Sequence, residues 1–334
     1  MTSDGALLAA AGAEGLVSLF ALPALDNGSL RRADADADAE PESRTPVATV
    51  PVHRRWIADV QWVSSTADAS SRLLLTAADD GLLQLSRVDV ATSAAAVQVV
   101  PLARLAAELH HGGIYSMEEA GGMVATSSKD DSVGVSALHP AGGLAVARAY
   151  RDIGAGVVKT VRWQRRGGPS VLACGGNDHT VRVYDLRRAG DAPVLVLEGV
   201  HAGAVNTVAF SPAAEWQLLS SGFDGAIRLW DLRAGDAPAA PWAEFTGHHG
   251  RAKPGLMHPV YALDGRAVVT GGQNSPHLFL YDVAARTLGD VVTLGWTPGS
   301  LHAHPLDGSR LLASSGKNGL WLLDPLRLAD GGAA

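Results

Sequence analysis

Short apolar runs separated by polar turns recur along almost the whole chain. The clearest unit spans residues 205–233, VNTVAFSPAAEWQLLSSGFDGAIRLWDLR, where a Ser-Pro pair and Phe223-Asp224-Gly225 separate three runs of near-alternating apolar and polar residues. Alternation with a period of two is typical of β-strands, and Ser-Pro and Asp-Gly pairs mark turns. We therefore predict three strands of one antiparallel meander in this unit.

The same layout recurs in six further segments, at 56–88, 114–138, 157–187, 266–283 and 309–325, with a shorter strand–turn–strand pair at 6–22. Aligning the tight turns gives one residue for each repeat: Glu14, Asp80, Asp130, Asp178, Asp224, Asn274 and Asn318. Successive turns lie 44–50 residues apart, except for a first step of 66 residues. A period of this size predicts a solenoid or a propeller, here with seven repeats.

The long first step contains a polar, low-complexity segment at residues 26–46, DNGSLRRADADADAEPESRTP. Such a composition buries too little apolar surface to order itself, so we expect a flexible insert between the first and second repeats. Only five residues precede the first apolar run, which leaves no room for an innermost strand in the first repeat. Either residues 325–334 help to complete this repeat or it stays incomplete, and the sequence leaves both open.

Composition narrows the class of protein. Of the 334 residues, 47% are hydrophobic and 18% are charged, which allows a sizeable core. The net charge of −7 argues against direct binding to nucleic acid, because such binders carry an excess of Lys and Arg. The single cysteine, Cys174, excludes an internal disulfide, and no apolar run approaches the roughly 20 residues that cross a bilayer. We expect a cytoplasmic or nuclear protein without a membrane segment.

The ends of three repeats carry a family resemblance. Each ends on an aromatic residue followed by Asp: Tyr184-Asp185, Trp230-Asp231 and Tyr281-Asp282. With these pairs, and with histidines ahead of three turn aspartates, the chain resembles the WD40 repeat family over residues 6–325. The resemblance implies an all-β fold, a seven-bladed β-propeller of four-stranded antiparallel blades. Residues 1–334 would form a single propeller, whose first blade is either incomplete or completed with the help of residues 325–334.

In the WD40 family, a His before the first strand, a Ser or Thr in the second, the turn Asp and a Trp in the third form a hydrogen-bonded quartet. The fifth repeat matches all four positions, whereas the second and third have Ser86 and Ser136 where the Trp belongs. A buried carboxylate is costly unless it is paired, and His with a hydroxyl supplies that pairing. The structural quartets implied are His53, Thr76 and Asp80; His110, Thr126 and Asp130; and His201, Ser220, Asp224 and Trp230.

The candidate reactive residues do not assemble a catalytic site. The sets of His, hydroxyl and Asp resemble triads, but they recur in successive repeats, whereas an enzyme needs one site of differentiated groups. Cys174 lies in the middle of a strand, where a lone cysteine is usually a buried apolar residue. The histidine-rich segment 246–259 lacks zinc-site spacing, and residues 34–40 lack the Gly and final Glu of a calcium loop. We expect a non-catalytic protein without a metal or cofactor.

In the family architecture, the turns between second and third strands and the loops into the first strands share one face, the top, a common partner surface. Aromatic and Arg side chains dominate interface energies, and an aromatic residue in a glycine-flanked turn is unusual. The loop before the sixth repeat holds His248, His249, Arg251, Lys253 and His258. Such a local cluster of cationic residues favours an acidic or phosphorylated ligand; the competing interpretation is that one member has a structural role and the others are solvated. Packing inside the protein is the competing interpretation for Trp56 and Phe223. The candidate partner-binding residues are Arg55, Trp56, Lys129, Lys159, Phe223, His249, Arg251 and Lys253, and we expect Asp79, Asn177 and Asn206 to be exposed beside them.

The leading interpretation is a scaffold or adaptor whose top face joins proteins in a multiprotein complex, without direct binding to nucleic acid. A second interpretation comes from residues 184–187 and 230–233, which match the WDxR box of substrate receptors of cullin-type ubiquitin ligases. Arg187 and Arg233 would then contact the ligase adaptor. A third is a propeller hydrolase of small esters, for which the sequence offers no asymmetric pocket.

Overall fold

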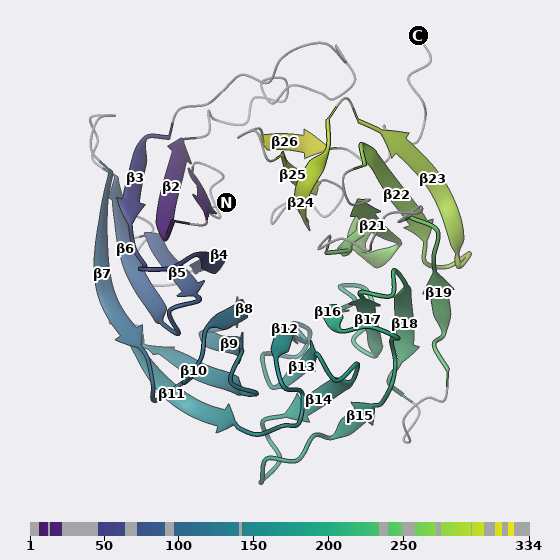
Figure 1. Ribbon diagram of the computed structural model, residues 1–334, viewed down its shortest axis with the longest axis horizontal. Helices are drawn as coiled ribbons and strands as arrows, with labels where there is room; N and C mark the ends of the chain where they lie inside the picture. Colours follow the sequence, from purple (N-terminus) through teal and green to yellow (C-terminus); the bar gives the residue numbers. More distant parts are fainter. Residues whose placement is uncertain are drawn as a thin grey trace. The chain divides into compact units, whose positions relative to one another are not determined.

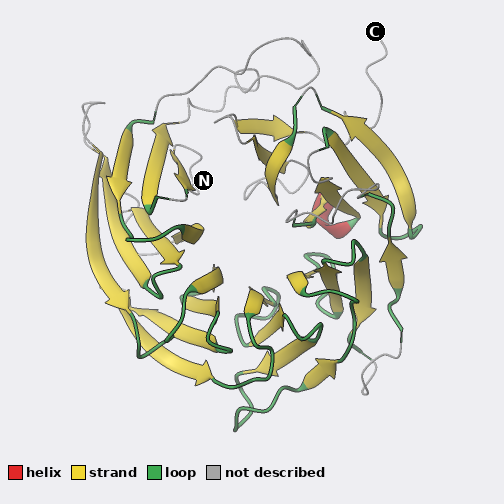
Figure 2. Ribbon diagram, in the orientation of Figure 1, coloured by secondary structure: helices red, strands yellow, loops and turns green. Residues whose placement is uncertain are grey.

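The computed structural model describes residues 7–12, 14–21, 46–63, 72–90, 97–139, 142–233, 240–248, 258–271, 275–294, 296–303, 311–315 and 320–323. In these ranges the regular structure is β-strand, with a single 3-10 turn, η1 (Leu263–Gly265), as Figure 2 shows. All strand pairs are antiparallel, so the all-β prediction is confirmed. The chain divides into two compact units, one of residues 1–24 with 45–196 and one of residues 25–44 with 197–334.

The first unit contains four sheets whose strands follow chain order. Figure 1 shows the second, third and fourth of these sheets side by side, with β4 packed beside β8 and β8 beside β12. The first sheet has three described strands and the others have four. The strands are β1 (Leu7–Ala11), β2 (Leu16–Ala21) and β3 (Ala48–Pro51); β4 (Ile57–Val63), β5 (Arg72–Ala78), β6 (Leu83–Val90) and β7 (Val97–Leu105); β8 (Ile114–Ala120), β9 (Met123–Ser128), β10 (Val133–His139) and β11 (Gly143–Tyr150); and β12 (Val158–Trp163), β13 (Val171–Gly176), β14 (Val181–Asp185) and β15 (Leu195–Leu197).

The second unit contains three sheets of the same kind, of which the last has three described strands. The strands are β16 (Val205–Phe210), β17 (Gln217–Gly222), β18 (Ile227–Asp231) and β19 (Ala243–Phe245); β20 (Val260–Ala262), β21 (Ala267–Gly271), β22 (His277–Asp282) and β23 (Thr287–Thr293); and β24 (Pro298–Ala303), β25 (Leu311–Ser315) and β26 (Leu320–Leu323).

Among the described residues, the first and last sheets each have one strand fewer than the other sheets. Glu14 lies between β1 and β2, so β1 holds the position that second strands hold in the other repeats. Among the described residues, the first sheet therefore shows strands equivalent to the second, third and fourth of the other repeats. Residues 325–334, the second possible contributor to this repeat, lie outside the described residues. The insert at 26–46 also lies outside the described residues, except for its last residue. A single propeller over 1–334 therefore stays a prediction.

The sequence repeat is also a repeat of strand register. Trp230 on β18 stands opposite Leu218 on β17, and Tyr184 on β14 stands opposite Leu172 on β13. Ser86 and Ser136 hold the same register position in the second and third sheets. Asp80, Asp130, Asp178 and Asp224 each fall between the second and third strands of their sheet, so residues that align in these four repeats hold equivalent positions in their sheets.

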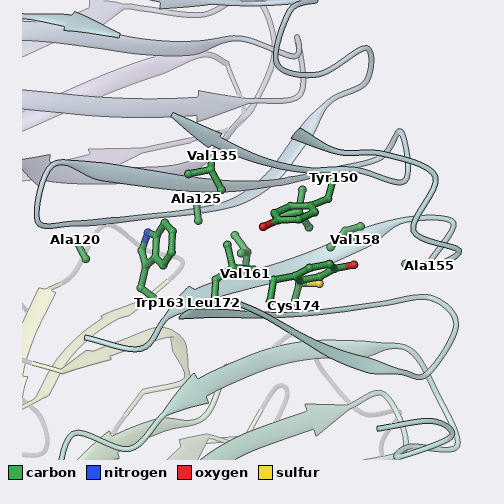
Figure 3. Close-up of a cluster of buried hydrophobic side chains, with 12 residues drawn as sticks. Ala120, Ala125, Val135, Tyr150, Ala155, Val158, Val161, Trp163, Leu172 and Cys174 are labelled. Carbon is green, nitrogen blue, oxygen red and sulfur yellow. The ribbon is translucent and has the colours of Figure 1, made fainter. Parts of the chain in front are cut away.

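Small aliphatic side chains fill the layers between neighbouring sheets. Figure 3 shows one such layer in the first unit, where Trp163 of β12 and Leu172 of β13 lie across from Ala125 of β9. The rings of Tyr150 and Tyr184 pack at 4.3 Å between centroids in the same layer. Cys174 is 1% exposed there, and burial raises the pKa of its thiol to about 12. The thiol is thus placed as an apolar core residue, because only the thiolate is nucleophilic.

Candidate functional site

The fifth repeat holds a continuous chain of four polar side chains. Trp230 Nε1 donates to Ser220 Oγ at 2.9 Å, Ser220 Oγ lies 2.8 Å from His201 Nε2, and His201 Nδ1 lies 2.9 Å from Asp224 Oδ1. These contacts fit a neutral imidazole that carries its proton on Nδ1 and accepts from the serine hydroxyl. Each polar atom in the chain then has a partner, which is the condition for burying it.

The charge of this network is fixed by its surroundings. Burial lowers the pKa of His201 and keeps the ring neutral. Burial alone would raise the pKa of Asp224, but hydrogen bonds from Arg228, the Ala202 amide and His201 outweigh it and hold that pKa well below its usual range. Arg228 Nη1 lies 2.9 Å from Asp224 Oδ2. The network is therefore an ionised carboxylate beside a neutral histidine.

The second and third repeats form related networks without a tryptophan. In the second, His53 Nδ1 lies 3.1 Å from Asp80 Oδ1, and its Nε2 lies 2.8 Å from Thr76 Oγ1. In the third, His110 Nε2 lies 2.7 Å from Thr126 Oγ1. His110 and Asp130 stand 3.7 Å apart, beyond a direct hydrogen bond. The hydroxyl of Ser132 contacts both and bridges them, a member that the sequence analysis missed.

The sixth repeat contains a buried histidine that the sequence analysis placed in a binding loop. His248 is 2% exposed, and its Nδ1 lies 2.9 Å from the hydroxyl of Tyr281, which donates to the Thr246 carbonyl. Tyr281 stands at the register position of Trp230. His248 thus has a structural role within this loop cluster, because the aromatic residue at the strand end offers a hydroxyl to the ring. The sequence contained a signal for this structural role, because His248 precedes the first strand of its repeat, as the quartet histidines precede theirs.

Six side chains from three consecutive sheets of the first unit gather at the edge that carries the turns between second and third strands. Arg55 and Trp56 come from the loop before β4, and Asp79 from the turn after β5. Tyr115 lies at the start of β8, Lys129 in the turn after β9 and Lys159 at the start of β12. We refer to these six residues as the aromatic-basic cluster.

The two rings of the cluster hold its ammonium groups. Trp56 and Tyr115 meet edge-to-face, with 5.8 Å between ring centroids. Lys129 Nζ lies 5.8 Å from the centroid of Trp56 and 5.4 Å from that of Tyr115, and Lys159 Nζ lies 5.0 Å from the centroid of Tyr115. These distances are within the range of cation–π attraction. Both rings are half-buried, so each leaves part of its surface exposed.

Asp79 fixes the cations on one side of the cluster. Its Oδ1 accepts from Lys129 Nζ and its Oδ2 from Arg55 Nη1, the latter at 3.1 Å. Burial would raise the pKa of Asp79, but the hydrogen bonds from Lys129 and Arg55 lower it below its ordinary value. The Asp79 side chain is only 7% exposed, so the expectation of an exposed residue was wrong. The two cations cover it, while Arg55 itself stays 65% exposed.

A glycine makes room for this carboxylate. A Cβ on Gly113 would lie 2.5 Å from Asp79 Oδ1, closer than any real contact of that kind. The backbone before β8 therefore approaches Asp79 directly. Tyr115 follows Gly113 by two residues, so this close approach also places the Tyr115 ring in the cluster.

The remaining candidates from the sequence are distributed differently. Phe223 lies in the second unit and is half-buried. Asn206 is 4% exposed, so the expectation that it lies on the surface was wrong; it is the second residue of β16 and is buried there. Asn177 is exposed as expected. The loop residues His249, Arg251 and Lys253 lie outside the described residues.

Both WDxR arginines fold back on the aspartate of their own repeat. Arg187 donates through Nε and Nη2 to the two carboxylate oxygens of Asp185, at 2.8 and 2.7 Å. Arg233 contacts Asp231 in the same way and lies 3.8 Å from the ring centroid of Trp216. Their side chains are 70% and 62% exposed. They lie at the ends of third strands, in separate sheets from one another.

Metal-binding clusters and membrane-crossing helices are both absent from the part of the chain that the structure describes. In that part, no three His, Cys, Asp or Glu side chains are grouped so that they could hold a metal ion. Likewise, none of its helical segments has the length and hydropathy that a membrane crossing needs.

Comparison with known proteins finds WD-repeat proteins. The family WD40 (WD domain, G-beta repeat) matches residues 192–231. The ribosome biogenesis protein WDR12 homolog of Chlamydomonas reinhardtii is 37% identical over 67 residues, which are 20% of this chain and 15% of that protein. The U5 small nuclear ribonucleoprotein 40 kDa protein of Dictyostelium discoideum is 36% identical over 83 residues, 25% of this chain and 22% of that protein.

Among solved structures, the WD40 β-propeller domain of Doa1 matches with a TM-score of 0.67 and 17% sequence identity, covering 96% of this chain and 90% of that chain. At this identity the match shows the fold, and the predicted β-propeller fold is confirmed by it. The matched segments span less than a quarter of either curated relative. What those whole proteins do is therefore a matter for the proposal below.

Proposed function

We propose that this propeller with WD40 repeats is a non-catalytic module that binds a protein partner on the aromatic-basic cluster. The observation that carries the proposal is the convergence of Trp56, Tyr115 and three cations at one edge of three consecutive sheets. Aromatic and Arg side chains supply most of the binding energy at protein interfaces. The three networks of His, hydroxyl and Asp repeat from sheet to sheet and are buried, which supports a role in stability instead of chemistry.

Preorganisation supports a binding role for the same residues. Asp79 holds Arg55 and Lys129 in place, and the Tyr115 ring lies against both lysines. Long cationic side chains lose rotamer freedom when they bind, and a site in which they are already held avoids part of that cost. The cluster is thus better suited to a specific partner than isolated surface lysines would be.

The named assemblies of the relatives support a partner in a multiprotein complex. One relative is named for ribosome biogenesis and the other for the U5 small nuclear ribonucleoprotein. By analogy, we propose that this chain works inside an assembly, in the nucleus or the cytoplasm.

The test is affinity capture with the full chain from a lysate of its source organism, followed by mass spectrometry. We expect Trp56→Ala to lose the proteins that wild type captures. Trp216→Ala is the matched control, since Trp216 is also a half-buried tryptophan in contact with a cation, Arg233. Melting curves of both variants show whether the fold is kept.

The same capture experiment distinguishes our proposal from the interpretation as a substrate receptor of a ubiquitin ligase. A ligase substrate receptor would lose its main partner on Arg187→Ala together with Arg233→Ala, because those residues would contact the ligase adaptor. Retention of all partners by Trp56→Ala, with loss in the double arginine variant, would replace our proposal with the receptor interpretation.

A further inference from the structure

We infer that the partner segment bound by the aromatic-basic cluster is acidic, with one carboxylate placed between Lys129 and Lys159 and an apolar neighbour on Trp56. This inference rests on the proposed function and adds the chemistry of the ligand. It starts from the arrangement of charge. Arg55 and Lys129 both contact the carboxylate of Asp79, and Lys159 lies on the ring of Tyr115, in a chain whose net charge is −7.

Two further turn carboxylates of this edge, those of Asp80 and Asp130, are directed into the fold. Asp80 accepts from the amides of Arg54 and Leu82 and contacts His53. Asp130 accepts from the His111 amide and from the hydroxyl of Ser132. These partners within the fold compensate the charges of Asp80 and Asp130. In the cluster itself, three cations then outnumber one carboxylate, so its outward side is positive.

The two lysines share one ring. Both ammonium groups lie within 5.4 Å of the Tyr115 centroid, one from the turn after β9 and one from the start of β12. Burial and the nearby charge of Lys129 both lower the pKa of Lys159. An anion placed between two like charges removes their repulsion and offers each a charge-assisted hydrogen bond.

A protein carboxylate fits this site better than a nucleic-acid backbone. Affinity for nucleic acid grows with the number of phosphates neutralised, and three cations at one spot reach few of them. The rings of Trp56 and Tyr115 also meet edge-to-face at 63°, whereas stacking of successive bases requires open ring faces. An acidic side chain next to an apolar one matches the pairing of ammonium groups with a half-buried indole.

The test uses the full chain and a fluorescein-labelled peptide in which Glu and Gly alternate around a central Leu, read by fluorescence anisotropy. We expect binding that weakens as salt rises, because exposed charges are screened. Lys129→Met and Lys159→Met should each weaken it about tenfold or more. Arg187→Gln is the matched control: it also removes one charge from a cation paired with an aspartate, and should leave the affinity unchanged.

Two comparison probes decide the chemistry. The same peptide with Gln for every Glu should not bind, and a single-stranded oligonucleotide of thymidine should bind more weakly than the Glu peptide. Equal binding of the Gln peptide, tighter binding of the oligonucleotide, or no binding of the Glu peptide would overturn the inference. If Trp56→Ala still loses its captured proteins in those cases, the proposed function stands and only the acidic ligand fails. If Trp56→Ala retains them, the proposed function fails as well.

Discussion

The side chain of Gln61 completes a β-bridge with the backbone of Glu119. Gln61 Nε2 donates to the Glu119 carbonyl at 3.1 Å, and Gln61 Oε1 accepts from the Glu119 amide at 2.8 Å. On the same strand, Asp59 accepts from the Met117 amide at 3.0 Å. Glu119 and Met117 belong to β8, the first strand of its sheet. This strand pairs with β9 on one side and has no strand neighbour of the same sheet on the other. Side chains of β4 thus satisfy backbone groups that an edge strand leaves open.

Replacing Gln61 should destabilise the protein through β8. In Gln61→Leu the buried amide and carbonyl of Glu119 lose their partner, at a cost of about 1–3 kcal/mol in the free energy of unfolding. Urea unfolding measures this loss, and hydrogen exchange at the Glu119 amide should become faster. Gln98→Leu, at an exposed position of β7, is the control. Unchanged exchange at Glu119 would mean that the bridge does not protect this edge.

The fifth-repeat network should contribute more to stability than a surface ion pair of the same composition. Asp224→Ala leaves His201 and Arg228 without the carboxylate, and each unsatisfied buried group costs about 1–3 kcal/mol. Asp185→Ala removes the partner of the exposed Arg187 and should cost much less. Equal shifts of the urea midpoint in the two variants would argue against a buried network.

Stability should fall as the pH is lowered from 7 to 5. Burial lowers the pKa of His53 and of His201, so the unfolded chain takes up protons near its ordinary pKa of about 6.5, before the folded chain does. Stability therefore decreases below this pH. The double variant His53→Gln with His201→Gln should show a flatter dependence of the unfolding free energy on pH. His139→Gln, at the exposed end of β10, is the control. A slope equal to that of wild type in the double variant would contradict this account.

Gly222 should not tolerate a side chain. A Cβ at this position would lie 2.6 Å from Cγ of His201, in the interior of the network. Gly222→Ala must displace the imidazole, and overpacking of this kind costs about 1–3 kcal/mol. At Gly143 the nearest atom to a new Cβ is 3.5 Å away, so Gly143→Ala should be nearly neutral. Thermal unfolding of the two variants provides the comparison, and similar melting temperatures would disprove the steric requirement.

Cys174 should be inert in the folded protein. Its side chain is buried, and the thiol with a pKa of about 12 is protonated at neutral pH. Iodoacetamide reacts with thiolates, so labelling should be slow in buffer and complete in concentrated urea. Mass spectrometry measures the labelled fraction with time. Rapid labelling under native conditions would show that the layer around Cys174 opens.

Within each repeat, the strands, turns and polar networks could be predicted from the sequence. Alternation with a period of two and turn residues are local signals, and the register that they set brings His201, Ser220 and Asp224 together. Because the pattern recurs, a residue in one repeat predicts its equivalent in another. The role of Ser132 could not be predicted in this way, because its bridge between His110 and Asp130 in the third repeat has no counterpart in the fifth.

The aromatic-basic cluster and the bridge from Gln61 to Glu119 depend on how neighbouring sheets pack. Tyr115 holds the same repeat position as Lys159, which sequence reasoning did select, but nothing local indicates that the two side chains meet. The burial of Asp79 follows from cations that come from two different repeats. A sequence repeat specifies each sheet, whereas contacts between sheets join residues about 50 positions apart whose side chains differ from one repeat to the next. Only the tertiary structure decides which of these side chains meet, because side-chain packing across the layer between sheets, and not strand periodicity, sets those distances.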